Sequence, residues 1–531
     1  MPVWDVIVVG SGFGGAVMAA RLAEKGMKVL VLERGRWWDS KTVKDERTAY
    51  PRGLRDAWIW NQERPERENG WVDFRHFRHM SVVQGAAVGG GSLIYANISA
   101  EAPRAAFETG WPPELTFTEL KPHTDRVAKV MNVQALPPSQ WPRRTELVKE
   151  SAEAIGAGDR FQPLDLAVSF DPDWRYTEDG SSRDVARSKR FRNGQGVEQG
   201  TCVHLGECDI GCPADAKNTL DRNYLALGQM HGLTIRPLHF VGIIEPVTEG
   251  FAVHFNVLRD GIKIPGSERA KKVVIAAGSL GSTELLLRCR DEHRTLPRVS
   301  DRLGYGWCSN GDFLTPAYYP QRLINPTHGP TITSAINYLD GSEGSRYWIE
   351  DGGFFHLFGG KSPKPSHSRL RALAARLTVE GLQELLKVAN PLPHIMPWFA
   401  QGMDAADGHM TLRKKWIVLG TKKLHLDWDV SRSEAVIKTI VAKHKQLSAA
   451  TGGLALVPPT WTVGKSLVTP HPLGGCGMGC SSEDGVVDHR GEVFGHPGLF
   501  VVDGSIVPRA LGVNPSRTIG GLSERAAALF N

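Results

Sequence analysis

Cysteine is scarce in this sequence. The 531 residues include seven cysteines, a small and odd number that argues against a disulfide framework and favours reduced thiols. No run of about 18 apolar residues occurs, so no membrane-spanning helix is expected. Met1–Asp5 leads straight into a predicted strand, without the basic and apolar regions of a signal peptide. We therefore expect a cytoplasmic protein that makes no stable insertion into a membrane.

A strong excess of one charge is also missing. The sequence holds 63 Lys and Arg against 57 Asp and Glu, a net charge of +6, and the basic residues are scattered except within 361–376. Proteins that bind nucleic acid usually gather such residues on one face, so no nucleic-acid partner is expected. Glycine, in contrast, is abundant. The 58 glycines favour tight turns and close backbone approaches, which a large cofactor requires.

The N-terminal residues predict one complete dinucleotide-binding unit. Apolar runs over 6–9 and 29–32 predict buried strands, and 16–25 predicts a helix between them. The turn after the first strand carries Gly10, Gly12, Phe13, Gly14 and Gly15. In such a turn the first glycine allows the tight bend, the second admits a pyrophosphate, and the last lets helix and strand pack closely. Glu33 ends the second strand, where an acid bonds a ribose hydroxyl and disfavours NADP.

Five later segments resemble motifs of the glucose-methanol-choline (GMC) oxidoreductases. Residues 85–97 and 273–286 resemble the two family signatures, 471–476 and 512–515 the C-terminal active-site motifs, and 499–505 the strand that holds the flavin chain. The motifs stand in family order from residue 6 to near the C-terminus. The pattern is most similar to the bacterial cholesterol-oxidase branch, although Ser516 and Arg517 depart from it after Pro515, which leaves sterol specificity in doubt.

The resemblance implies an α/β fold. A Rossmann-like FAD-binding domain would be intertwined with an α+β substrate domain that carries a mainly antiparallel sheet. The FAD-binding domain would comprise 1–100, 200–310 and 466–531, and the substrate-binding or cap domain 101–199 and 311–465. Besides the glycine turn and Glu33, the residues implied to contact FAD are Gly89, Gly90, Gly91, Ser92, Asn97, Val241, Asp503, Gly504, Asn514, Pro515 and Ser516. FAD is expected to be non-covalent, because 93–98 contains no histidine.

The resemblance also implies the catalytic residues. Alcohol oxidation removes a hydroxyl proton and a hydride from the same carbon. His471 would take the proton, Asn514 would bond the substrate oxygen, and flavin N5 would accept the hydride. Glu350 is a further catalytic candidate by rough position only. Structural alternatives remain for each: His471 could bond a loop carbonyl, Asn514 could cap the following helix, and Glu350 could be a surface or core-edge acid.

Three other segments leave alternatives open. Cys202, Cys208 and Cys212 are spaced closely enough to ligate an iron–sulfur cluster, but buried structural thiols and no metal are favoured. Residues 277–281 imitate the turn that carries the serine nucleophile of hydrolases, against which a helix-capping Ser279 is favoured. Apolar residues at helical spacing over 370–388 predict either an ordinary packing helix or a lid at a membrane surface.

The sequence therefore predicts oxidation of a hydrophobic alcohol, whether sterol-like, aryl or long-chain. The product would be a ketone or aldehyde, and oxygen would be reduced to hydrogen peroxide. The alternatives are a dehydrogenase that uses another electron acceptor, a lyase or light-driven decarboxylase on the same scaffold, and a flavin-binding protein without turnover.

Overall fold

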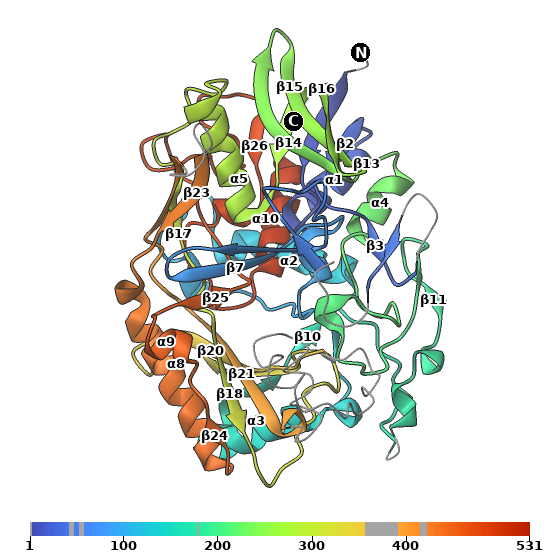
Figure 1. Ribbon diagram of the computed structural model, residues 1–531, viewed down its shortest axis with the longest axis vertical. Helices are drawn as coiled ribbons and strands as arrows, with labels where there is room; N and C mark the ends of the chain where they lie inside the picture. The colour runs from blue at the N-terminus through green and yellow to red at the C-terminus, as the bar shows by residue number, and fades with distance from the viewer. Residues whose placement is uncertain are drawn as a thin grey trace, which may run out of the picture.

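The protein has two regions that lie one above the other in the computed structural model (Figure 1). The structure describes residues 3–41, 47–51, 58–177, 180–355, 391–414 and 422–530, so the helix expected over 370–388 lies outside the described residues. In Figure 1 both termini lie in the upper region with helices α1 and α10, and the lower region holds strands β18, β20 and β21 beside helix α8.

The upper region is built on a sheet whose central strands are parallel. Its strands come from both ends and the middle of the chain. In spatial order they are β13 (Thr234–Arg236), β2 (Val29–Leu32), β1 (Trp4–Val9), β16 (Ile262–Ile275), β15 (Gly250–Arg259) and β14 (His239–Val247), with β26 (Leu499–Val501) also paired to β16. The last residues of β16 pair in parallel with β1 and β26. Its earlier residues pair with β15, which pairs with β14, in an antiparallel meander.

Two helices from opposite ends of the chain pack together on this sheet. Helix α1 (Phe13–Glu24) connects β1 to β2, and α10 (Ser516–Leu529) lies beside it. Arg21 of α1 contacts Glu524 of α10 at 2.7 Å, and Lys25 Nζ donates to the last carbonyls of α10. Helix α2 (Phe117–Val130) packs on α10 as well, although it falls in the range expected for the substrate domain.

The lower region contains an antiparallel sheet of six strands. In spatial order they are β24 (Leu454–Ala455), β18 (Phe313–Tyr318), β21 (Ile395–Gly402), β20 (Tyr347–Asp351), β19 (Ser334–Tyr338) and β9 (Phe161–Pro163). Helices α3 (Arg143–Ala154) and α8 (Val430–Ala450) pack against this sheet and against each other. The Rossmann-like unit and this antiparallel sheet confirm the predicted fold class.

Smaller elements join the two regions. One sheet has the strand order β25 (Leu467–Thr469), β7 (Met80–Gly85), β6 (Val72–His76) and β5 (Ile59–Trp60), and another the order β17 (Tyr305–Trp307), β22 (Gly408–Lys414) and β23 (Lys422–Asp427). The remaining helices and strands are α4 (Tyr224–Met230), α5 (Gly278–Leu287), α9 (Pro459–Thr462), β3 (Trp38–Asp39), β4 (Thr48–Ala49), β8 (Gln134–Ala135), β10 (Asp165–Leu166), β11 (Phe191–Arg192) and β12 (Glu198–Gln199).

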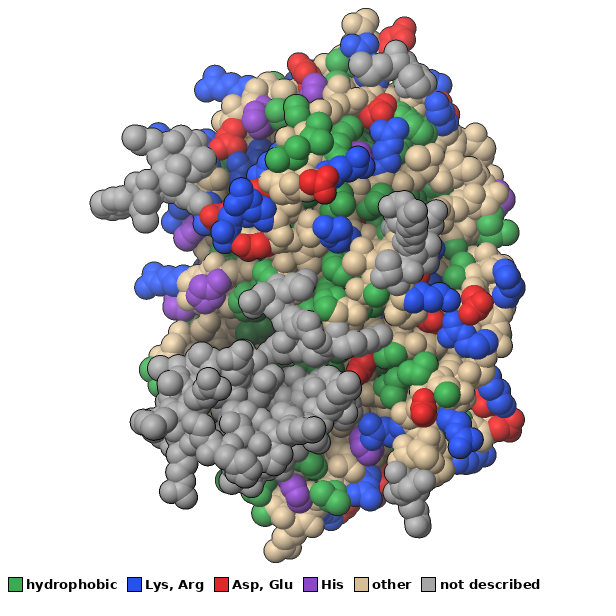
Figure 2. Space-filling model, turned by 45° about the vertical axis from the view of Figure 1, so that its right-hand side comes forward, with side chains coloured by type: hydrophobic (Ala, Val, Ile, Leu, Met, Phe, Trp, Pro, Cys, Tyr) green, Lys and Arg blue, Asp and Glu red, His purple; other side chains and the backbone are tan. Residues whose placement is uncertain are grey.

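The surface carries both charges. On the face shown in Figure 2, the acidic and basic side chains are interspersed rather than separated into patches. Within the described ranges, no helix combines the length and the apolar character that a membrane span requires.

Candidate active site

A cavity of about 1560 Å³ extends from the dinucleotide-binding unit to the antiparallel sheet. Its wall includes the turn after β1, the segment around His471, the start of α10, and residues of β18 and β21. A pocket for one drug-sized ligand typically measures roughly 300–1,000 Å³. This cavity therefore has room for a large cofactor and a second molecule.

Most of the residues implied by the family resemblance line this cavity. They are Gly10, Gly12, Phe13, Gly14, Glu33, Gly90, Gly91, Val241, Asp503, Gly504, Asn514, Pro515 and Ser516, together with His471. Gly15, Gly89, Ser92, Asn97 and Glu350 do not belong to its lining. Within the second group, the Ser92 hydroxyl donates to Gly89 O at 2.7 Å and accepts from Leu220 N, whereas the buried amide atoms of Asn97 have no partner among the described residues.

The glycines of the first turn have different physical roles. Gly10 has a φ of +98°, and a Cβ there would lie 2.3 Å from Ala276 O. A Cβ on Gly14 would lie 1.8 Å from Val502 O, and one on Gly15 would lie 2.1 Å from Gly10 O. These three positions admit only glycine because neighbouring backbone fills the space. Gly12 differs, because its nearest neighbour would be 4.0 Å away, so its open side faces the cavity.

Glu33 ends β2 with its carboxylate buried against the glycine turn. It accepts hydrogen bonds from Ser11 N at 3.0 Å, Ser11 Oγ at 2.7 Å and Gly35 N at 2.9 Å. Burial raises the pKa of Glu33 despite these bonds. A carboxylate offers about four lone-pair sites, so one site remains for a ribose hydroxyl.

His471 follows strand β25 and is held by a carboxylate that sequence reasoning missed. Its Nδ1 lies 2.9 and 3.0 Å from the two oxygens of Asp312, whose side chain is fully buried. Thr469 Oγ1 donates to Asp312 at 2.5 Å and accepts from His471 N at 2.9 Å. Burial lowers the pKa of His471, but the Asp312 carboxylate outweighs it and the net shift is upward. With Nδ1 engaged, Nε2 is the ring nitrogen available to a ligand in the cavity.

Asn514 lies two residues before Ser516, the first residue of α10. Pro515, rather than Asn514, is the N-cap residue of this helix, so the capping alternative for Asn514 is wrong. Asn514 Oδ1 is buried and has no hydrogen-bond partner among the described residues. Ser516 Oγ donates to Ile98 O at 3.2 Å. The amide oxygen of Asn514 is therefore free to bind a ligand near the N-terminus of a helix.

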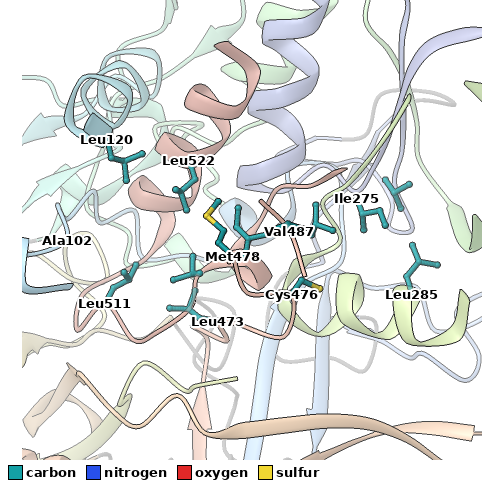
Figure 3. Close-up of a cluster of buried hydrophobic side chains, with 14 of the residues drawn as sticks. Ala102, Leu120, Ile275, Leu285, Leu473, Cys476, Met478, Val487, Leu511 and Leu522 are labelled. Carbon is teal, nitrogen blue, oxygen red and sulfur yellow. The ribbon is translucent and has the colours of Figure 1, made fainter. Parts of the chain in front are cut away.

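A shared hydrophobic core anchors the two active-site loops, which are the segment that begins at His471 and the segment that ends at Asn514. Leu473 and Cys476 follow His471, and Leu511 precedes Asn514. All three are fully buried and belong to the cluster drawn in Figure 3, together with Met478 and Val487. The polar ends of the two loops are thus exposed to the cavity while their apolar residues fix them in place.

Glu350 lies on β20 outside the cavity lining. It is fully buried and accepts hydrogen bonds from Trp348 Nε1 at 2.7 Å and Gln401 Nε2 at 2.9 Å. Burial raises its pKa to about 7, and the charge of His471 lowers the same pKa. The surface-acid alternative is therefore wrong. The charges of Glu350 and His471 therefore interact, although Glu350 does not form part of the cavity wall.

The second signature ties α5 to the C-terminal segments. Ser279 Oγ donates to Gly474 O at 2.8 Å, and Ala277 is the N-cap residue of α5, so Ser279 does not cap the helix as expected. Asp503 accepts from Gly278 N at 2.9 Å and from the hydroxyls of Ser282 and Ser505 at 2.5 and 2.6 Å. Asp503 thus lines the cavity, but its carboxylate oxygens accept hydrogen bonds from within the protein.

A buried lysine contacts the segment that carries the three cysteines. Lys217 Nζ donates to Leu93 O at 2.9 Å and to Cys208 O at 2.6 Å, which joins the first signature to the cysteine segment. Burial raises the pKa of Cys202 and of Cys208. In the described part of the chain, no three or more His, Cys, Asp or Glu residues are grouped as metal ligands.

Comparison with known proteins decides the family. A family model of GMC oxidoreductases matches residues 404–523, and one of NAD(P)-binding Rossmann-like domains matches 8–52. A cholesterol oxidase of Acinetobacter baumannii is 30% identical, over 98% of this chain and 93% of that protein. A cholesterol oxidase of Mycobacterium tuberculosis is also 30% identical, over 100% of this chain and 91% of its own.

The chain belongs to the GMC oxidoreductase family. The crystal structure of pyridoxine 4-oxidase from Mesorbium loti shares the fold, with a TM-score of 0.63, 16% identity and 99% of each chain covered. The family resemblance inferred from the motifs is thereby confirmed. This GMC oxidoreductase is an FAD-dependent enzyme that oxidises alcohols at a CH–OH group.

The residues of this GMC oxidoreductase fit FAD. The N-terminus of α1 opens onto the cavity at Gly12, where no side chain of the described structure caps it. Free backbone N–H groups at such a helix start bind phosphate. A Cβ on Gly91 would also meet nothing within 4 Å, and Asn514 supplies an unpartnered buried oxygen. Each feature marks a place where the protein leaves backbone or polar atoms for a bound group.

Sequence reasoning missed part of this GMC oxidoreductase site. Asp312 follows no recognisable motif and stands 159 residues before His471. Phe399 lines the cavity with its ring centroid 6.2 Å from that of His471, but in the sequence it is one of several large apolar residues. Asp209 also lines the cavity, and burial raises its pKa to about 6. In the sequence, the only signal at Asp209 is its position directly after Cys208.

Proposed function

We propose that this enzyme oxidises a hydrophobic alcohol, sterol-like, aryl or long-chain, to the ketone or aldehyde, with His471 as the base. The observation that carries the proposal is the His471 ring, fixed through Nδ1 by Asp312 and lining the same cavity as Asn514, whose buried amide oxygen has no partner among the described residues. Nε2 would accept the hydroxyl proton, and Asn514 would orient the alcohol oxygen. Bound FAD supplies the hydride acceptor.

The apolar part of the cavity wall supports a hydrophobic substrate. Its side chains near the antiparallel sheet include Leu314, Ile332, Phe355 and Phe399. Asp209 adds one carboxyl group to this part of the wall. The two cholesterol oxidases at 30% identity carry a sterol in their names, and a cavity of this volume could hold such a molecule beside FAD. Because both relatives are named oxidases, oxygen is the electron acceptor that we propose.

FAD would be held without a covalent bond by backbone and polar groups from distant segments. Gly12 and Phe13 would face the pyrophosphate, Glu33 the ribose, and Val241 the adenine, since Val241 lies at a bulge in β14 that opens onto the cavity. The residues proposed for the FAD-binding domain are 1–100, 200–310 and 466–531. The substrate domain would then comprise 101–199 and 311–465, with α2 packed across the boundary.

The test is the visible spectrum of the purified holoenzyme under anaerobic conditions, with sterols, aryl alcohols and long-chain alcohols added in turn. We expect one class to bleach the flavin, and readmitted oxygen to restore the spectrum with release of hydrogen peroxide. Bleaching that persists in oxygen but is reversed by a quinone or dye would make the enzyme a dehydrogenase. A flavin that no alcohol bleaches would contradict the proposal and favour a lyase or photoenzyme.

A further inference from the structure

Residues 308–312 contact both active-site loops. Backbone pairing joins Cys308 to Leu473, two residues after His471, at 3.0 and 3.2 Å. The Asn310 side chain donates to Val513 O at 2.9 Å and accepts from the N–H groups of Leu511 and Gly512 at 2.9 and 3.0 Å. Asp312 ends the segment at the His471 ring. One short segment therefore reaches the base and the chain that precedes Asn514.

The backbone of this segment is bent so that its polar side chains diverge. Asn310 and Gly311 both have positive φ values, +59° and +65°. Asparagine tolerates this conformation better than most residues, and a Cβ on Gly311 would lie 2.5 Å from Gly402 O. Asp404 holds the start of the bend by accepting from Ser309 N at 3.0 Å and Ser309 Oγ at 2.8 Å. A positive φ at a residue other than glycine is energetically unfavourable, so it persists only where surrounding contacts hold it.

We propose that residues 308–312 form the positioning element of the active site. Asp312 would hold the His471 ring with Nδ1 protonated, so that Nε2 carries the lone pair that accepts the proton of the substrate hydroxyl. Asn310 would fix the loop 511–513 and thereby the amide of Asn514. The inference rests on the proposed role of His471 as a base. Asp312 would act through His471 and touch neither the substrate nor FAD, which makes it a positioning residue.

The charges around His471 give this role a measurable sign. Asp312 and Glu350 are the ionisable groups that act on the His471 pKa, and both raise it against the effect of burial. Asp404 faces Asp312 instead and has a pKa raised by burial to about 7. Removing the Asp312 charge leaves burial opposed only by Glu350, so the pKa of His471 must fall. The acid limb of the flavin-reduction rate would then move to lower pH.

The decisive variant is Asp312→Asn in the FAD-loaded enzyme. We expect kcat to fall about 10- to 100-fold, as for other residues that orient a reacting group, with KM and FAD content little changed. The acid limb should shift to lower pH by the sign given above. The matched control is Asp427→Asn, at a half-exposed aspartate of β23 whose charge does not act on the pKa of His471, so the acid limb should stay in place. Equal shifts in both variants would contradict the proposal.

A readout that needs no substrate separates this inference from the proposed function. Nitrogen NMR of ¹⁵N-histidine-labelled holoenzyme, with His471 assigned by His471→Asn, reports which ring nitrogen carries the proton. We expect the Nδ1-protonated form in the native enzyme and a lower His471 pKa in Asp312→Asn. An Nε2-protonated ring would overturn the inference. If the Nδ1 form is found but no alcohol bleaches the flavin, the positioning contact stands and the proposed reaction fails.

Discussion

The two walls of the cavity are built in different ways. On the side of the dinucleotide-binding unit the wall is mostly backbone, held in place by glycines whose missing side chains allow β1, α1 and β26 to meet. On the side of the antiparallel sheet it consists of side chains, such as Phe399 and Leu314, projected from paired strands. A backbone wall restricts which residues the sequence can use, whereas a side-chain wall can change its residues while keeping its shape.

The largest effect is expected from adding a side chain where backbone segments of the cavity wall pack against each other. Gly14→Ala would place a Cβ 1.8 Å from Val502 O, so α1 could not pack on the C-terminal strand. We expect loss of the folded protein, measured by yield and thermal unfolding. Gly12→Ala is the matched control, since its Cβ would meet nothing closer than 4.0 Å. That variant should fold but bind FAD weakly, and equal behaviour of the two would remove the distinction between packing and cofactor glycines.

The next effect concerns the point where the two walls meet. His471→Ala should slow flavin reduction by an alcohol about 10²- to 10⁴-fold, the usual contribution of a general base, while FAD content stays the same. Rapid-reaction spectroscopy measures the rate. His254→Ala, at a half-exposed histidine of β15 outside the cavity lining, is the control. Reduction of His471→Ala at the native rate would show that another group takes the proton.

The smallest effect is expected on the side-chain wall. Phe399→Ala removes a ring next to His471 and should lower kcat/KM for bulky alcohols about 10- to 100-fold, because burying such a side chain contributes about 1.5–3 kcal/mol. Small alcohols and FAD content should be unaffected. Steady-state kinetics with a short and a long alcohol of the same series give the comparison. An equal loss of kcat/KM for both alcohols would show that Phe399 supports His471 rather than binding the substrate.

The parts of the site that could be predicted from the sequence are those where one residue type is required locally. The strand at 29–32 is observed with the predicted bounds, and Gly10, Gly12 and Glu33 lie around the cavity as expected. Helix α10 begins at Ser516, directly after Pro515. In each case a backbone conformation or a close approach restricts the choice of residue within a short stretch.

The sequence by itself determined the dinucleotide-binding unit and the family, and it singled out His471 and Asn514 as cavity residues, because each belongs to a short motif whose physical requirements are local. Only the tertiary structure decided that Asp312 holds His471, that Asn310 holds the loop before Asn514, and that Glu350 lies behind the cavity wall. These contacts join residues 51 to 203 positions apart. Strand pairing and core packing create them, and neither leaves a pattern within any one stretch of the chain.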